Sequence, residues 1–76
     1  MAGTKRLNLL DVAEPICLLM CKRTIEGMRR GDILEVFMRD PEAVENLVKV
    51  VARSPDEVLA LERRGNHFRI EIRREK

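Results

Sequence analysis

The sequence is poor in the aromatic residues on which nucleic-acid recognition often depends. It has no tryptophan, no tyrosine and two phenylalanines among its 76 residues. Proteins that bind single-stranded nucleic acid stack the bases on aromatic side chains, so a stacking platform is poorly supplied here. The formal net charge of +2 is also too small to indicate nucleic acid by itself. An RNA-facing patch built from the arginine doublets at positions 29–30, 63–64 and 73–74 stays open as a third functional hypothesis, after the two given below.

The chain also lacks a long apolar segment and a set of metal ligands. No apolar run approaches the ~20 residues of a membrane-spanning helix, and the polar start is unlike a signal peptide. We therefore expect a cytoplasmic protein that has no membrane segment. The only histidine, His67, is distant in sequence from both cysteines, and no Cys-x-x-Cys pair occurs. No metal site and no cofactor are expected.

Cysteine is scarce, and its two copies are expected to be reduced thiols. Cys17 and Cys21 are one helical turn apart, where Cβ atoms lie ~5–6 Å from each other, against the ~3.8 Å of a disulfide. Disulfides are also rare in the cytoplasm. Cys21 is expected in the core. Cys17 is either a small half-buried apolar residue or a reactive thiol near the start of a helix.

The length of the chain limits the kind of site that it can hold. Seventy-six residues are room for one domain, which we place at 1–76. A chain of this size buries only ~60% of the surface that its unfolded form exposes, so its core is thin. A deep pocket with several converging groups needs more protein than this. We therefore expect a reactive spot or a docking surface.

The first half of the chain predicts a strand, a helix and a second strand. Residues 5–10 are predicted to form a short strand. Pro15 then opens a helix, because the missing N–H of proline costs nothing at the first helical position. Arg29 and Arg30 would lie in the last turn of this helix, and Gly31 would end it. The helix has one apolar stripe with spacings of three and four, made of Leu18, Cys21, Ile25 and Met28. A second strand follows at 33–39.

The second half predicts another helix and a hairpin. Asp40-Pro41 is a strong helix start, with an N-capping acid before a first-turn proline. Ser54-Pro55 ends this helix. Two strands, at 57–63 and 67–73, flank a tight turn at 64–66. The last strand alternates apolar and charged residues, so one face of the sheet is expected to be wet.

These elements predict an α/β two-layer sandwich. Each helix follows a strand, which implies parallel crossovers, and the hairpin adds an antiparallel pair. The result is a mixed four-stranded sheet in the order βαβαββ, with both helices on one face. One core should contain Leu18, Ile25, Val36, Leu47, Val51, Phe68 and Ile70. The open face would carry an apolar patch of Ile33, Phe37, Leu59 and Leu61, so a dimer and a monomer both stay open.

Several short motifs resemble those of one protein family. They are Gly31-Asp32-Ile33-Leu34-Glu35-Val36, Asp40-Pro41, the turn glycine Gly65, and Asn46-Leu47 at the place of an Asp-Ile pair. Their order and spacing resemble the TusA/SirA family of small sulfur carriers over 7–74. The resemblance implies the fold described above, a setting in sulfur metabolism, and a protein partner that donates or accepts sulfur.

The chain departs from this family at the motif that carries the chemistry. The family has Cys-Pro-x-Pro at the start of the first helix, where this chain has Glu14-Pro15-Ile16-Cys17. Leu10-Asp11 likewise replaces an Arg-Gly pair in the preceding loop. A cysteine at a helix N-terminus has its thiolate stabilised by the helix dipole. Glutamate keeps the negative charge and cannot form a persulfide. Glu14 is either an acid at the helix start that interacts only with the helix dipole, or a fixed anion that hydrogen-bonds to the first helical turn.

Two functional hypotheses follow from the resemblance and the departure. In the first, the chain is a sulfur-relay protein whose sulfur acceptor has moved to Cys17. In the second, it is a non-catalytic module that binds a protein partner through Glu14, Pro15 and Asp11. Whether the chain is an enzyme is left undecided, since it has a sulfurtransferase-like pattern without the cysteine of that family.

Overall fold

Local signals in the sequence place most of the elements of this protein. The computed structural model describes residues 3–76. The carboxylate of Asp40 accepts a hydrogen bond from the Glu42 backbone N–H at 2.9 Å, and Pro41 follows the cap as the first helical residue. Gly65 adopts a positive φ of 62° in the hairpin turn, a conformation that glycine reaches without steric cost. The predicted starts of the second helix and of the hairpin are confirmed.

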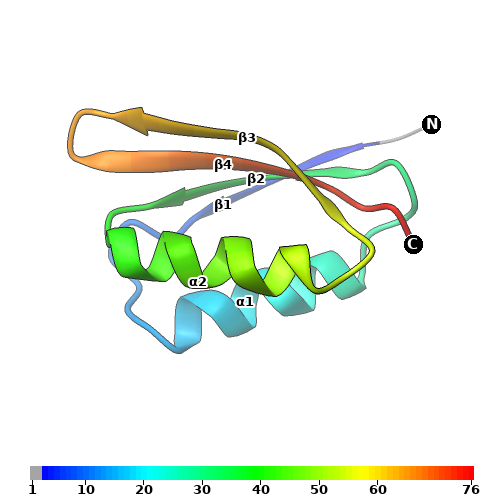
Figure 1. The fold of residues 1–76 in the computed structure, drawn as a ribbon, viewed down its shortest axis with the longest axis horizontal. Helices are drawn as coiled ribbons and strands as arrows, with labels where there is room; N and C mark the ends of the chain where they lie inside the picture. Colours follow the sequence, from blue (N-terminus) through cyan, green and yellow to red (C-terminus); the bar gives the residue numbers. More distant parts are fainter. Residues whose placement is uncertain (1–2) are drawn as a thin grey trace.

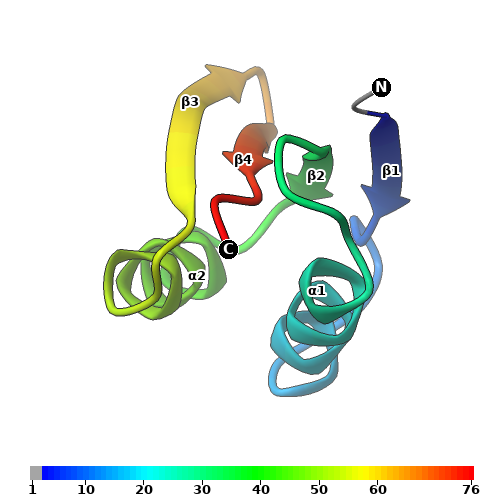
Figure 2. The same ribbon diagram turned by 90° about the vertical axis from the view of Figure 1, so that its right-hand side faces the viewer.

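The sheet contains all four strands, and both helices cover one of its faces (Figures 1 and 2). The strand order is β1-β2-β4-β3, with β1 parallel to β2 and with β4 antiparallel to both of its neighbours. The predicted two-layer mixed sheet is therefore confirmed. The elements in chain order are β1 (Thr4–Asn8), α1 (Ile16–Glu26), β2 (Ile33–Met38), α2 (Pro41–Ala52), β3 (Glu57–Arg64) and β4 (His67–Arg73).

The first helix ends earlier than predicted. It stops at Glu26, with Gly27 as its C-cap, so Arg29 lies in the following loop and not in a last turn. The carboxylate of Asp32 explains this difference. It accepts hydrogen bonds from the backbone N–H groups of Arg29 and Gly3, both at 2.8 Å, and so closes a tight turn after the helix. The Gly31-Asp32 pair of the family motif therefore has a structural role, because Asp32 holds the turn between α1 and β2.

The core lies between the helices and the inner face of the sheet. Val36 and Ile70 are fully buried in the middle of the sheet, on neighbouring strands. Leu18 and Phe68 were predicted in this core but are only partly buried, and they pack against its edge. The other predicted core residues are confirmed as buried: Ile25, Val36, Leu47, Val51 and Ile70.

Ion pairs cross the open face of the sheet. Glu35 of β2 pairs with Arg6 of β1 and with Arg69 of β4, and Arg69 also pairs with Glu62 of β3. All four strands are thus linked by one charged network. The middle of this face is therefore polar, with the partly exposed ring of Phe37 beside it.

The hairpin contains a bulge that changes which face one leucine occupies. Val58 pairs with Ile72 and Leu61 pairs with Ile70, so one extra residue is accommodated between them. Directly opposed residues share a face, which places Leu61 on the helix side of the sheet. The prediction that Leu61 lies on the open face is therefore wrong. Leu59 is the extra residue of the bulge and has no paired residue on β4.

The arginine doublets lie at two ends of the molecule. The doublet at 63–64 ends β3 at the hairpin tip, and those at 29–30 and 73–74 lie at the opposite end (Figure 1). Arg73 pairs with Glu57 and Glu75, and Arg74 pairs with Asp56. The doublets therefore do not form one basic patch. Among residues 3–76, no helix is both long and apolar enough to cross a membrane.

Candidate functional site

The end of the molecule where β1 and β2 finish is also where both helices begin (Figure 1). In open α/β sheets, ligand sites form outside the carboxyl ends of the strands. The segment 9–15 connects β1 to α1 across this end and carries Asp11, Glu14 and Pro15. Cys17 follows in the first turn of α1. The fold therefore brings the residues predicted for the site into one region.

Glu14 is held by the second helix and not by the first. Its Oε2 accepts a hydrogen bond from the Nδ2 of Asn46, in α2, at 2.8 Å. No side chain caps α1, whose N-cap residue is Pro15. The hypothesis that Glu14 hydrogen-bonds to the first turn of α1 is therefore wrong. A side-chain cap acts from the N-cap position itself, and Glu14 lies one residue before it.

Asn46 is the site residue that the sequence analysis did not single out. It stands where the resembled family has aspartate, and it faces the residue that stands where that family has cysteine. Two carboxylates at this distance would repel each other, whereas an amide donates a hydrogen bond to a carboxylate. The two departures from the family pattern therefore fit each other. Their joint occurrence was the available signal.

Cys17 is fully buried, so the expectation of a half-buried residue is wrong. Burial raises the pKa of the Cys17 thiol, and the nearby charges of Glu14 and Asp40 raise it further. Hydrogen bonding from the first-turn backbone N–H groups acts in the opposite direction and is outweighed. Cys17 is therefore a poor source of thiolate in this conformation.

Cys21 is buried in the core, as predicted. Burial, with a smaller contribution from Cys17, raises the pKa of its thiol to about 12. A thiol with that pKa is protonated at neutral pH and has no route to solvent. Both cysteine side chains are thus packed in the core of the folded protein.

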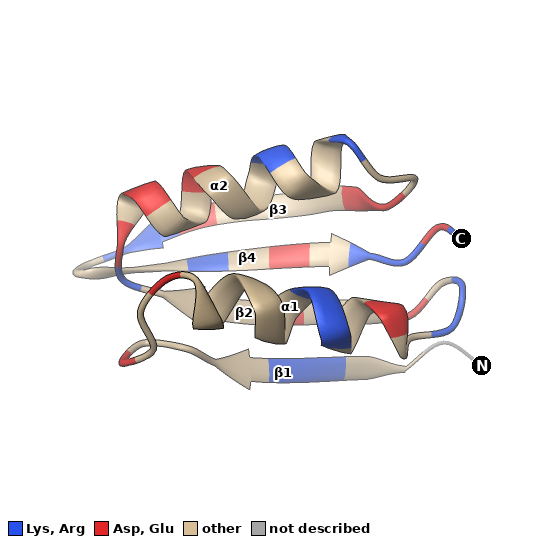
Figure 3. Ribbon diagram, turned by 90° about the horizontal axis from the view of Figure 1, so that it is seen from below, with Lys and Arg blue, Asp and Glu red and all other residues tan. Residues whose placement is uncertain are grey.

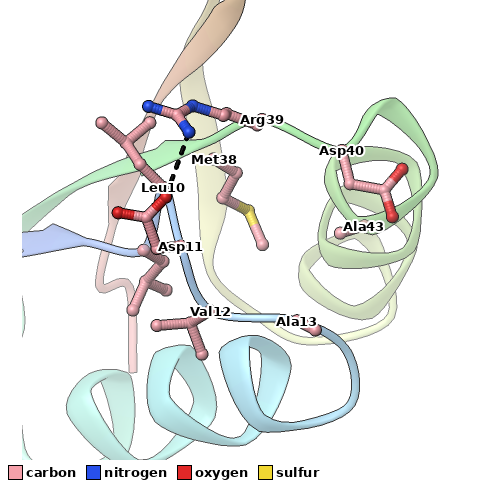
Figure 4. Close-up of a pocket in the computed structure, with 9 residues that line it drawn as sticks. Leu10, Asp11, Val12, Ala13, Met38, Arg39, Asp40 and Ala43 are labelled. Atoms are coloured by element: carbon pink, nitrogen blue, oxygen red, sulfur yellow. Dashed lines mark hydrogen bonds and ion pairs between the residues drawn. The ribbon is translucent and has the colours of Figure 1, made fainter.

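A hollow lies between segment 9–13 and the start of α2 (Figure 4). Its volume is about 210 Å³, and its floor includes the buried side chains of Met38 and Ala43. Asp11 and Arg39 form an ion pair on one side, with 3.0 Å between Oδ1 and Nη1. Both side chains are largely exposed, so the pair contributes at most about 1 kcal/mol and can exchange partners.

The outer face of the first half of α1 is apolar. Ile16 is 54% exposed and Leu19 is 52% exposed, and Met20 lies next to them on the same helix face. The first half of α1 carries no charged residue (Figure 3). Exposed apolar side chains of this kind are often found in contacts between proteins.

The site contains no arrangement for a metal. Within the part of the chain that the structure describes, no three His, Cys, Asp or Glu side chains gather as ligands. What the site offers is one fixed carboxylate, an exposed ion pair, a small hollow and an apolar helix face.

The chain matches a known protein family. The family model described as "Sulfurtransferase TusA" matches residues 5–74, nearly the whole chain. A search of curated proteins finds no match.

Proposed function

Because this chain belongs to the TusA family of sulfurtransferases, we propose that it serves a sulfur relay as a protein-binding module that carries no sulfur itself. The observation that carries this proposal is the pairing of Glu14 with Asn46 at the place of the persulfide cysteine. The carboxylate is fixed there by a partner residue suited to it. The site is therefore built around an anion that cannot accept sulfur.

The state of the thiols supports the same proposal. Sulfur transfer requires a thiolate that can reach a donor persulfide. Cys17 and Cys21 are both fully buried, and the pKa of each thiol is raised. In this folded conformation, neither thiol is accessible to the persulfide of a donor.

The binding surface would comprise the predicted residues and the apolar face of α1. Glu14 supplies the charge, Asp11 and Pro15 lie on the connecting segment, and Ile16 and Leu19 supply apolar contact. Interfaces of this kind combine a few anchoring side chains with a polar rim. The partner would be a protein of the relay.

A second candidate function is sulfur transfer through Cys17. It is favoured by one observation, the position of Cys17 in the first turn of α1, directly after segment 9–15. Helix ends open locally more easily than their middles. Displacement of this segment by a donor enzyme would expose the Cys17 thiol.

A loading experiment separates the two functions. The protein is incubated with a cysteine desulfurase and cysteine, and its intact mass is measured without reductant. We expect no gain of sulfur by the natural protein. The Glu14→Cys variant should gain one sulfur atom, because a thiol at the start of a helix has a lowered pKa.

The Glu14→Cys/Cys17→Ala variant is the matched control, since it locates the sulfur on residue 14. Loading of the natural protein on Cys17, to the extent seen for the variant on residue 14, would contradict the proposal and establish a carrier with a displaced cysteine. Failure of both proteins to load would show that the donor no longer docks.

A further inference from the structure

The position of the negative charge distinguishes glutamate from an empty carrier cysteine. In a thiolate the charge lies one bond beyond Cβ. In a persulfide it lies on the outer sulfur, two bonds beyond Cβ, one of them an S–S bond of about 2 Å. In glutamate the carboxylate oxygens lie three shorter bonds beyond Cβ. The charge of Glu14 therefore extends about as far from the backbone as the charge of a loaded cysteine would.

This charge is held in place and can be reached. The hydrogen bond from Asn46 fixes Oε2, and the Glu14 residue is only partly buried. A carboxylate offers about four acceptor positions, so one bond to Asn46 leaves capacity for donors of a partner. Ile16 and Leu19, which follow Glu14 along the chain in the first half of α1, are exposed and supply apolar contact area.

We propose that Glu14 imitates the persulfide of a loaded carrier, so that this chain binds the protein that accepts sulfur and not the enzyme that donates it. This inference rests on the proposed function as a binding module. The donor enzyme must fit a carrier whose cysteine is empty. The negatively charged persulfide of the donor would then occupy the same space as the negatively charged Glu14 carboxylate, and the two would repel each other. The acceptor protein must fit a carrier that is loaded with sulfur. Its hydrogen-bond donors would meet the Glu14 carboxylate at the position of the persulfide anion. Selection between the two partners thus comes from repulsion as well as attraction.

The complex with an acceptor cannot proceed to transfer. In the normal step, the acceptor thiolate attacks the outer sulfur of the carrier persulfide, the S–S bond breaks, and the carrier cysteine leaves as a thiolate. A carboxylate has no sulfur to give and no such bond to break. The chain therefore occupies the acceptor and competes with the loaded carrier.

A reconstituted relay tests this inference. It contains a cysteine desulfurase, a TusA-family carrier that retains Cys-Pro-x-Pro, the thiol protein that accepts sulfur from that carrier, and cysteine labelled with ³⁵S. Loading of the carrier and transfer to the acceptor are measured separately as the natural chain is added. We expect transfer to be inhibited and loading to be unchanged.

The variants identify the role of the charge. Glu14→Gln keeps the shape and removes the charge, and should need about tenfold more protein for the same inhibition, as expected for a lost hydrogen bond to a charged group. Glu26→Gln makes the same change at the other end of α1, on an exposed residue, and should inhibit like the natural chain.

Each alternative outcome has a distinct meaning. Inhibition of carrier loading by the natural chain would contradict the imitation of a persulfide. So would equal inhibition of transfer by the natural chain and by Glu14→Gln. Either result would still agree with the proposed function as a binding module. If the natural chain changes neither loading nor transfer, both the imitation of a persulfide and the proposed binding module are contradicted.

Discussion

Glu14 and Asn46 form a pair whose members depend on each other. Their hydrogen bond joins the segment before α1 to the middle of α2, across 32 positions of sequence. Neither residue would be informative alone, since an exposed acid and an exposed amide are both common on protein surfaces. Together they fix one carboxylate between the segment before α1 and the helix α2.

The Asn46→Asp variant should be less stable than the natural protein by about 1 kcal/mol at neutral pH, because the amide donor is lost and two carboxylates face each other. Adding Glu14→Gln should restore most of this loss, since glutamine can donate to the new aspartate. Urea unfolding of the two single variants and the double variant measures the coupling. Strict additivity of the two changes would show that the side chains do not interact in solution.

Both cysteines should resist alkylation in the native protein. Their thiols are fully buried and their pKa values are raised, so reaction must wait for local opening. We expect Cys17 to react faster than Cys21, because it lies in the first turn of α1. Iodoacetamide labelling of Cys17→Ala and Cys21→Ala variants, followed by mass spectrometry with and without urea, measures each rate. Labelling of Cys17 at the rate of a free thiol would contradict its burial.

At the scale of elements, the two helices begin in different ways. The carboxylate of Asp40 caps α2, whereas α1 begins at Pro15 without any side-chain cap. The start of α1 therefore lacks the hydrogen bond that a side-chain cap supplies. The start of α2 is the better anchored of the two.

Asp40→Ala should lower the free energy of unfolding by about 1 kcal/mol, the usual cost of losing an N-cap. Urea unfolding followed by circular dichroism checks this value. Glu45→Ala is the matched control, because Glu45 is an acid on the same helix that makes only an exposed pair with Lys49, worth about 0.5 kcal/mol or less. Equal effects of the two substitutions would mean that the cap is not formed.

At the scale of the whole molecule, two acids connect segments that are far apart in sequence. Asp32 binds the backbone near the N-terminus, and Glu35 connects the edge strand β1 to β4 through Arg6 and Arg69. Hydrogen bonds from the Gly3 and Arg29 backbone hold the pKa of Asp32 below its usual value. Hydrogen bonds from Arg69 and Arg6 do the same for the pKa of Glu35.

These lowered pKa values make the fold sensitive to acid. The unfolded chain binds protons more readily than the folded chain, so stability rises with pH in the carboxyl range. The contribution is present above the ordinary pKa of a carboxyl group, about 4, and is lost as pH falls through the lower folded values. We expect the urea midpoint to be level near neutral pH and to fall below pH 4. Glu35→Gln should start from a lower midpoint and fall less steeply, and a fall as steep as that of the natural protein would contradict this account.

The order of the elements and the layers could be predicted from the amino-acid sequence, because the signals for them are local. The Asp40-Pro41 start, the Gly65 turn and the alternation along β4 each act within a few residues. The apolar side of each element then has to meet the others, which leaves a two-layer sheet with both helices on one face. The family pattern and its break at Glu14 were also legible in the sequence.

The state of the site could not be predicted from the amino-acid sequence. The burial of Cys17 depends on the sheet packed above it, and the partner of Glu14 comes from another helix. The bulge before Leu61 and the early end of α1 likewise depend on pairing with β4 and on the hydrogen bonds of Asp32. Each of these outcomes is set by contacts between segments distant along the chain. Such contacts leave no periodic trace in the sequence, whereas helices, strands and turns do.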